Sequence, residues 1–349
     1  MPLTLHVSTR LPTRFSLNPF FRTMVLAAAA ATVLTSIAPR RAAAMNCQAA
    51  STRQEKAICT DPAAKAADEQ MAEAFAVLRS QISGPDRDTL VTDQRHWITT
   101  RNEMCGFDSR GGPLAGPSLS ACLGRESNQR RLFLSGMPSD GPGLPGSIRP
   151  FFLKGKGDGR VISGLRFAAP QSDGERLFNR AVDAQLRNVN VSNGSDGDAT
   201  DDFSMTLTYA SPALVSADVI ISYPTSAHPV DHHANVNVDL AAGRMLAFEN
   251  VFRREALDSL LAKCRPQLDD FIGAAAKADL SDNDMRESIL KDREKLVRMS
   301  AGDIQRWSLG RRQMTLIIDD AANSRITSTC QLDTASLKPL MQPDFSLAQ

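Results

Sequence analysis

Six cysteines constrain the fold of this 349-residue chain more than any other feature. They are Cys47, Cys59, Cys105, Cys122, Cys264 and Cys330. The closest two are twelve positions apart, whereas zinc ligands usually come in C-x-x-C spacings. An even number of widely spaced cysteines is typical of a disulfide framework in an exported protein. The sequence therefore predicts three disulfides that tie distant segments together.

The first 44 residues have the composition of a secretion signal. They carry five Arg and no Asp or Glu, and an apolar run from Met24 to Ala38 precedes the small residues Ala42 to Ala44. This order matches a charged start, an apolar centre and an A-x-A-like cleavage site. The run is about 15 residues long, short of the roughly 20 that span a bilayer. We expect cleavage near Ala44 and a periplasmic or secreted protein without stable membrane insertion.

Removing the signal changes the sign of the net charge. It takes five Arg from the 40 basic residues and leaves 35 against 39 acidic ones, a net charge of −4. Nucleic-acid binding needs clustered positive charge, so we expect no nucleic-acid partner. About 305 residues remain, which suffice for two domains.

Residues 45–134 have the periodicity of helices. Thr52 and Glu55 are spaced as a capping box, and Asp61-Pro62 marks the next helix start. Apolar residues then recur every three or four positions: Ala67, Met71, Phe75, Leu78 and Ile82. Gly84-Pro85 ends this stripe, and a third helix follows. These signals predict a small all-α domain stapled by disulfides.

Two more helices complete this predicted domain. Asp86 or Asp88 can cap the helix that runs to Cys105, and a last helix covers about 118–134. Between them, 106–117 is a loop rich in Gly and Pro. We prefer the sequential pairing of Cys47 with Cys59 and of Cys105 with Cys122. Four cysteines allow three pairings, and the sequence does not choose among them.

A linker and a second domain follow. Residues 135–150, SGMPSDGPGLPGSIRP, contain too much Pro and Gly for a regular element. Beyond them, β-like runs cover 161–168, 203–209, 214–223, 234–240, 245–248, 307–309 and 314–318, and helical patterns cover 173–186, 253–276 and 282–299. The domain 151–338 is therefore predicted as α+β with a mostly antiparallel sheet. Cys264, in a helix, and Cys330, after the last strand, would join helix to sheet.

Three histidines form the one cluster that suggests a metal. His228, His232 and His233 lie beside Asp231 and are candidate ligands of zinc or copper. Neighbouring residues of a strand point to opposite faces, which argues against three converging ligands, and no H-E-x-x-H is present. We expect a polar loop here and no cofactor. A metal-binding envelope protein or metal-dependent enzyme is the alternative.

No motif indicates catalysis. No Ser stands in G-x-S-x-G, and GKGDG at 155–159 lacks the context and the final Lys-Ser/Thr of a phosphate loop. The paired Asp at 201–202 and 319–320 adjoin predicted turns, where Asp is common for backbone reasons. We therefore expect a binding protein and not an enzyme.

One string in the helical part carries a family resemblance. It consists of Cys47, Glu55-Lys56-Ala57-Ile58-Cys59, Asp68, Phe75, Gln94-x-x-Trp97-x-x-x-Arg101-Asn102-x-x-Cys105, Cys122-Leu123 and Arg131-Leu132. Over 46–134 it resembles the LprI-type lysozyme inhibitors, secreted or periplasmic bacterial domains. The resemblance implies a protein partner, with lysozyme as the expected one. Arg110, in the loop between Cys105 and Cys122, is our candidate contact, because an Arg can pair with the carboxylates of a glycosidase.

Two further residues are candidates for binding. Trp97 and Arg101 stand one helical turn apart, so that the guanidinium can stack on the indole. For Trp97 we expect packing in the core, with this stacking as the alternative role.

A second resemblance concerns 150–335. It rests on Ala227-His228-Pro229, Asn237-Val238-Asp239-Leu240, Gly243-Arg244 and Glu249-Asn250-Val251-Phe252. This string is similar to the extracellular domain of RsiV-type anti-sigma factors, a lysozyme-sensing fold, although the Tyr- and Gly-containing final strand of that fold is not evident near 317–324. Both resemblances favour an envelope protein that interacts with lysozyme. A structural envelope scaffold is a further alternative.

Overall fold

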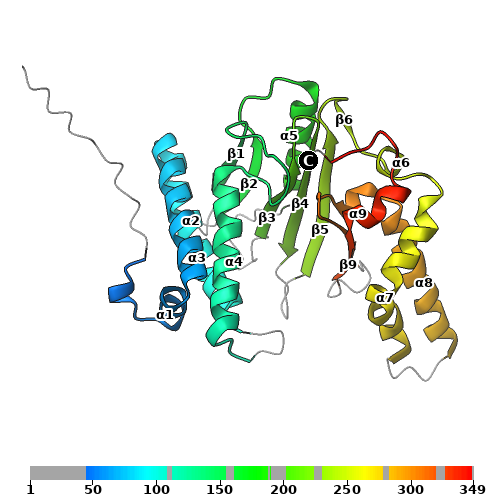
Figure 1. Ribbon diagram of the computed structural model, residues 1–349, viewed down its shortest axis with the longest axis horizontal. Helices are drawn as coiled ribbons and strands as arrows, with labels where there is room; N and C mark the ends of the chain where they lie inside the picture. The colour runs from blue at the N-terminus through cyan, green and yellow to red at the C-terminus, as the bar shows by residue number, and fades with distance from the viewer. Residues whose placement is uncertain are drawn as a thin grey trace, which may run out of the picture. The chain divides into compact units, whose positions relative to one another are not determined.

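The computed structural model describes residues 45–107, 112–154, 161–187, 189, 202–223, 230–277, 283–319 and 327–347. Residues 41–349 group into one compact unit. It begins with helices and continues as an α+β region with antiparallel sheets, so the predicted fold class is confirmed (Figure 1). The predicted signal, Arg110 and His228 lie outside the described residues.

Four α-helices build the N-terminal region after a short 3₁₀ turn. The turn is η1 (Cys47–Ala49), and the helices are α1 (Arg53–Thr60), α2 (Pro62–Gln81), α3 (Pro85–Met104) and α4 (Gly116–Ser135). The predicted capping box opens α1, where the Glu55 N–H donates to Thr52 Oγ1 at 3.1 Å and the Thr52 N–H donates to Glu55 Oε2 at 2.9 Å. The Asp61 carboxylate accepts from the first free N–H groups of α2. Local signals therefore fix the first two helix starts.

The start of α3 corrects one prediction. Neither Asp86 nor Asp88 is the N-cap, because Gly84 occupies that position with φ +59° and makes no side-chain cap bond. Pro85 takes the first helical position, where its missing N–H costs nothing. The two Asp residues lie in the first turn and stabilise the positive end of the helix dipole instead.

Among the described residues, three antiparallel sheets and both long and short helices form the α+β region. The strands are β1 (Ile148–Lys154) and β2 (Val161–Phe167) in one sheet, β3 (Asp202–Ala210), β4 (Leu214–Tyr223), β5 (Val230–Asp239) and β6 (Arg244–Met245) in the second, and β7 (Trp307–Ser308), β8 (Gln313–Asp319) and β9 (Thr327–Asp333) in the third. The helices are α5 (Asp173–Leu186), α6 (Phe248–Val251), α7 (Ala256–Lys277), α8 (Asn283–Ala301), η2 (Ile304–Arg306), α9 (Thr334–Leu337) and η4 (Lys338–Leu340).

Several strands differ from the sequence prediction. β1 and β9 were not predicted, and Cys330 lies in β9 instead of after the last strand. β5 starts at Val230, so His232 and His233 belong to a strand and not to a polar loop. The reason is pairing: β4 is an apolar strand that pairs with β5 without a register shift from Leu214 to Tyr223. A long partner strand extends β5 beyond what its own sequence favours.

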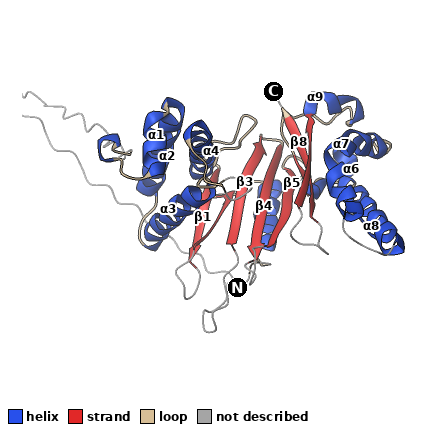
Figure 2. Ribbon diagram, turned by 90° about the horizontal axis from the view of Figure 1, so that it is seen from below, coloured by secondary structure: helices blue, strands red, loops and turns tan. Residues whose placement is uncertain are grey.

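Two hydrophobic clusters stabilise the α+β region. One lies between α5 and a face of the four-stranded sheet and includes Phe178, Val182, Val219 and Val236. The other lies between α7, α8 and the third sheet, which stand side by side in Figure 2, and contains Trp307. The Cys264–Cys330 disulfide is part of this second cluster and joins α7 to β9. Among the described residues, no helix is long and apolar enough to span a bilayer.

The segment predicted as a linker lies along the edge of β3. The N–H groups of Ser139, Asp140 and Gly143 donate to carbonyls of β3 at 2.8–3.0 Å. The Asp140 carboxylate accepts from Arg311 Nε at 3.2 Å and from the Arg312 N–H at 3.0 Å. These bonds attach the segment to both neighbouring sheets. The division of the chain into domains at 135–150 stays a prediction.

Candidate functional site

A buried guanidinium holds three helices of the N-terminal region together. Arg101 on α3 is 4 % exposed, and its Nη1 donates to Asp68 Oδ1 of α2 at 2.8 Å and to Ser127 Oγ of α4 at 3.0 Å. Its Nε and Nη2 donate to Asn102 Oδ1 at 3.2 and 3.1 Å. Every nitrogen of this guanidinium therefore has an internal partner. In the structure, Arg101 holds α2, α3 and α4 in position. Binding of a partner protein by Arg101 stays a prediction.

A second buried arginine makes a similar set of contacts between α3 and α4. Arg130 on α4 forms an ion pair with Asp93 of α3, and its Nε donates to Gln94 Oε1 at 2.9 Å. The half-buried ring of Trp97 lies beside both cations, with guanidinium carbons 5.0 Å (Arg101) and 5.6 Å (Arg130) from its centroid. Trp97 also packs against the buried cluster that contains Met71 and Leu90, so both the expected packing and the stacking with Arg101 are present. The string from Gln94 to Asn102 packs α3 against its neighbours.

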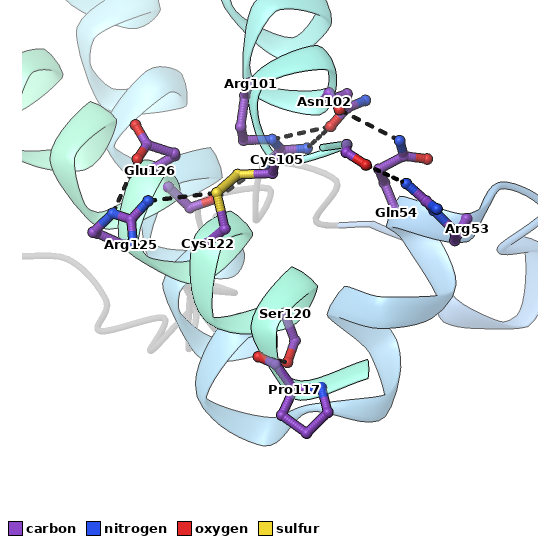
Figure 3. The surroundings of a disulfide bond; sticks show 12 residues. Arg53, Gln54, Arg101, Asn102, Cys105, Pro117, Ser120, Cys122, Arg125 and Glu126 are labelled. Atoms are coloured by element: carbon purple, nitrogen blue, oxygen red, sulfur yellow. Dashed lines mark hydrogen bonds and ion pairs between the residues drawn. A yellow bond between two sulfur atoms is a disulfide. The ribbon is translucent and has the colours of Figure 1, made fainter. Parts of the chain in front are cut away.

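The Cys105–Cys122 disulfide anchors the loop after α3 (Figure 3). Arg53 Nη2 of α1 donates to the Gly106 carbonyl at 2.9 Å, and Gln54 Nε2 donates to the Asn102 carbonyl at 3.4 Å. These bonds satisfy carbonyls that the end of a helix leaves free. The loop therefore starts and ends on fixed backbone. The pairings of Cys47 with Cys59 and of Cys105 with Cys122 are those preferred from the sequence.

Two apolar side chains are exposed beside this disulfide. Met104 is 56 % exposed and Phe107 is 58 % exposed, whereas Cys105 between them is buried. An isolated bridge between Phe107 and Pro113 closes the base of the loop. Exposed aromatic and Met side chains on a fixed backbone are the kind of residue that anchors a protein interface. Sequence reasoning missed both residues, because an apolar residue at the end of a helix or just beyond it carries no local signal of whether it is buried.

His232 and His233 lie at the outer edge of β5, next to an ion pair. The His233 N–H donates to Asp319 Oδ2 at 2.8 Å, and Arg306 Nη1 donates to the His233 carbonyl at 2.9 Å and to Asp319 Oδ2 at 3.2 Å. Burial lowers the pKa of His232, although Asp319 opposes this change and Arg306 adds to it. A neutral imidazole is thus favoured at neutral pH. The described residues contain no group of three His, Cys, Asp or Glu side chains arranged for a metal, and a metal site that includes His228 stays a prediction.

A pocket of about 570 Å³ lies next to these histidines, between α5, β5 and η2. Its apolar wall includes Leu177 and Ala181 of α5 and Val236 of β5, and polar side chains line the rest. Pockets of this size accommodate small molecules.

Replacing Asp218 of β4 by Asn should remove a pH-dependent loss of stability. Burial raises the pKa of Asp218 from 3.8 to about 7, against a weaker opposing hydrogen bond with Ser308, and its Oδ1 has no partner among the described residues. The Asp218 carboxyl therefore loses its proton at a lower pH in the unfolded chain than in the folded one. The free energy of unfolding falls as the pH rises from about 4 to about 7. In D218N, urea unfolding above pH 7 should show a gain on the order of 2–4 kcal/mol. The exposed control D88N should show no such gain, and equal slopes against pH in D218N and the parent would contradict the assignment.

Comparisons with known proteins cover both parts of the chain. Residues 44–134 match the family model described as lysozyme inhibitor LprI. A crystal structure of a DUF3298 family protein from Pseudomonas aeruginosa PAO1 aligns with 58 % of this chain and 97 % of its own, at 12 % identity and a TM-score of 0.38. One from Bacteroides fragilis NCTC 9343 aligns with 56 % and 94 %, at 12 % identity and a TM-score of 0.33. None of the curated proteins matches the chain.

The two resemblances seen in the sequence thus have different outcomes. The similarity of 150–335 to RsiV-type domains stays a prediction. For the helical region, the family match covers the same segment as the string from Cys47 to Leu132. Residues 44–134 of this chain are therefore similar to the LprI lysozyme-inhibitor family, as the sequence predicted.

Proposed function

We propose that this chain is exported to the cell envelope and binds a protein there, with lysozyme as the expected partner, and that it catalyses no reaction. The match of 44–134 to the LprI lysozyme-inhibitor family is the observation that carries this proposal. The three disulfides support export, because disulfides persist in oxidising compartments. The signal-like composition of residues 1–44 supports it from the sequence.

The contact surface in this proposal is the end of the helical region that the Cys105–Cys122 disulfide closes. There Met104 and Phe107 expose apolar surface, and the loop that follows carries Arg110. The anchored ends lower the entropy that the loop loses on binding. Exposed apolar residues close in sequence to a charged residue fit the apolar core and polar rim that protein interfaces commonly have.

A lysozyme activity assay tests the function. Oxidised protein of residues 45–349 should slow the lysis of cell walls by lysozyme in proportion to its concentration. Protein that has been reduced, alkylated and freed of reductant should lose this effect, while the disulfides of lysozyme stay intact. Full lysis at every concentration of oxidised protein, with lysozymes of different classes, would contradict the proposal.

Replacing Phe107 by Ala should weaken inhibition about 30-fold, because truncation of an interface anchor costs about 2 kcal/mol or more. Met104→Ala should weaken it less, and Arg110→Ala should lower the association rate at low salt. Val77→Ala removes a 50 % exposed apolar side chain from α2 and is the matched control for F107A. Arg95→Ala, on the exposed face of α3, is the control for the charge. Equal potency of F107A and V77A would place the contact elsewhere.

A further inference from the structure

Between His233 and Asn237, the outer edge of β5 has one residue whose backbone polar groups have no partner among the described residues. Alternate residues of an edge strand point both backbone polar groups away from the sheet. On β5 these include His233, bonded to Asp319 and Arg306, and Asn237, whose N–H donates to Gln305 Oε1 at 3.1 Å and whose carbonyl accepts from the Leu246 N–H at 2.9 Å. β5 pairs with β4 without a register shift, so the residue midway between them, Asn235, faces the same way.

Asn235 lies in the wall of the pocket between α5, β5 and η2. It is 3 % exposed, and its Oδ1 has no partner among the described residues. Its Nδ2 makes one long hydrogen bond, at 3.4 Å, to the Gln305 carbonyl. No described residue accepts from its backbone N–H, and none donates to its backbone C=O, on this edge. A buried residue with this many unused polar groups is costly unless something else pairs with them.

The other walls of the pocket define what fits there. Leu177 and Ala181 of α5 offer apolar surface, and the exposed Arg180 lines the pocket beside them. Arg180 has no ion pair within the part of the chain that the structure describes, whereas Arg306 is paired with Asp319. The Asp303 carboxylate accepts from the Gln305 N–H at 2.9 Å at the start of η2. Arg180 is therefore the lining cation that is available to a ligand.

We propose that this pocket binds the carboxyl-terminal residue of an N-acylated amino acid or peptide, held as a single β-bridge to Asn235. The N–H of the ligand donates to the Asn235 carbonyl, and a carboxylate oxygen accepts from the Asn235 N–H. The charge of the carboxylate is compensated by Arg180. Directly paired residues of antiparallel strands have their side chains on the same face, so the ligand side chain lies on the face of the Asn235 side chain, beside Gln305. One residue fits because Asp319, Arg306 and Gln305 occupy the edge on both sides of Asn235.

Titrations of the oxidised protein of residues 45–349 with matched probes test this site. The probes are N-acetyl-L-leucine, its amide N-acetyl-L-leucinamide, and an acetylated tripeptide that ends in leucine. Binding is followed by calorimetry and by the ¹⁵N–¹H signal of Asn235. We expect N-acetyl-L-leucine or the tripeptide to shift this signal, and the amide to bind at least about tenfold more weakly, which is about 1.4 kcal/mol. Binding of N-acetyl-L-leucine alone would identify a small N-acylated acid as the ligand. Binding of the tripeptide would identify the carboxyl terminus of a peptide.

Three variants locate the binding. Arg180→Ala should abolish the preference for the acid over the amide, whereas Arg187→Ala, an equal charge change at the exposed end of α5, should preserve it. Ala184→Trp should fill the pocket and abolish binding, with circular dichroism as the check on folding. The proposal is overturned if no acid probe binds at about 10 mM, a concentration above the dissociation constants of ordinary specific ligands. It is also overturned if acid and amide bind equally, or if A184W binds like the parent.

Discussion

Replacing Arg101 by Met should lower the free energy of unfolding by about 3–5 kcal/mol, because it leaves the buried carboxylate of Asp68 without its cation. The loss is large against the 5–15 kcal/mol by which folded domains are usually stable. Urea unfolding of oxidised protein, followed by circular dichroism, measures it. The tertiary contacts between α2, α3 and α4 should be lost first, since Arg101 of α3 bonds residues of both other helices.

Two comparisons separate the buried pair from a general effect of removing charge. Lys65→Met breaks the exposed pair of Lys65 and Glu69 on α2, whose side chains are 49 % and 51 % exposed, and should cost less than about 0.5 kcal/mol. The double variant R101M/D68L removes both buried charges and should be more stable than R101M alone. A double variant that is no better than R101M would show that shape, and not the unpaired charge, sets the cost.

Removing the Cys264–Cys330 disulfide should cost about 4 kcal/mol in the chain-entropy account, because it closes a loop with a sequence separation of 66. The same account gives about 3 kcal/mol for Cys47–Cys59, whose separation is 12. Cys264 and Cys330 are also buried in the cluster between α7 and β9, so the variant C264A/C330A loses packing in addition. Hydrogen exchange should show reduced protection in α7 first.

The variant C47A/C59A is the matched control, since it changes the same number of atoms in a less buried place. If the two variants had equal denaturation midpoints and equal slopes against urea, loop length and burial would not determine how much stability each disulfide contributes.

The helices were more predictable than the strands because their signals are local. The Thr52–Glu55 box, the Asp61-Pro62 start and the bounds of α5 at Asp173 and Leu186 all agree with the structure. β1 contains a proline and begins within a segment rich in Gly and Pro, and β9 has no clear alternation, so each depends on its partner strand. The extension of β5 through His232 and His233 likewise comes from β4.

The sites show the same limit. The string from Gln94 to Cys105 was recognisable in the sequence, but its packing role appears only when Asp68 and Arg130 are placed beside it. Nothing near Asn235 in the sequence indicates that residues about 70 positions later come to line the same pocket. Contacts between distant segments decide which polar groups remain unpaired, and local patterns do not report them.

The side chains that occupy the edge of β5 also have a consequence for self-association. An open strand edge is a template on which a second chain can add a strand, and repeated addition gives aggregates. Asp319 and Arg306 on one side and Gln305 on the other interrupt that template, so that between His233 and Asn237 a single residue remains accessible. The same arrangement that leaves room for one peptide residue is too short to nucleate a fibril between copies of the chain.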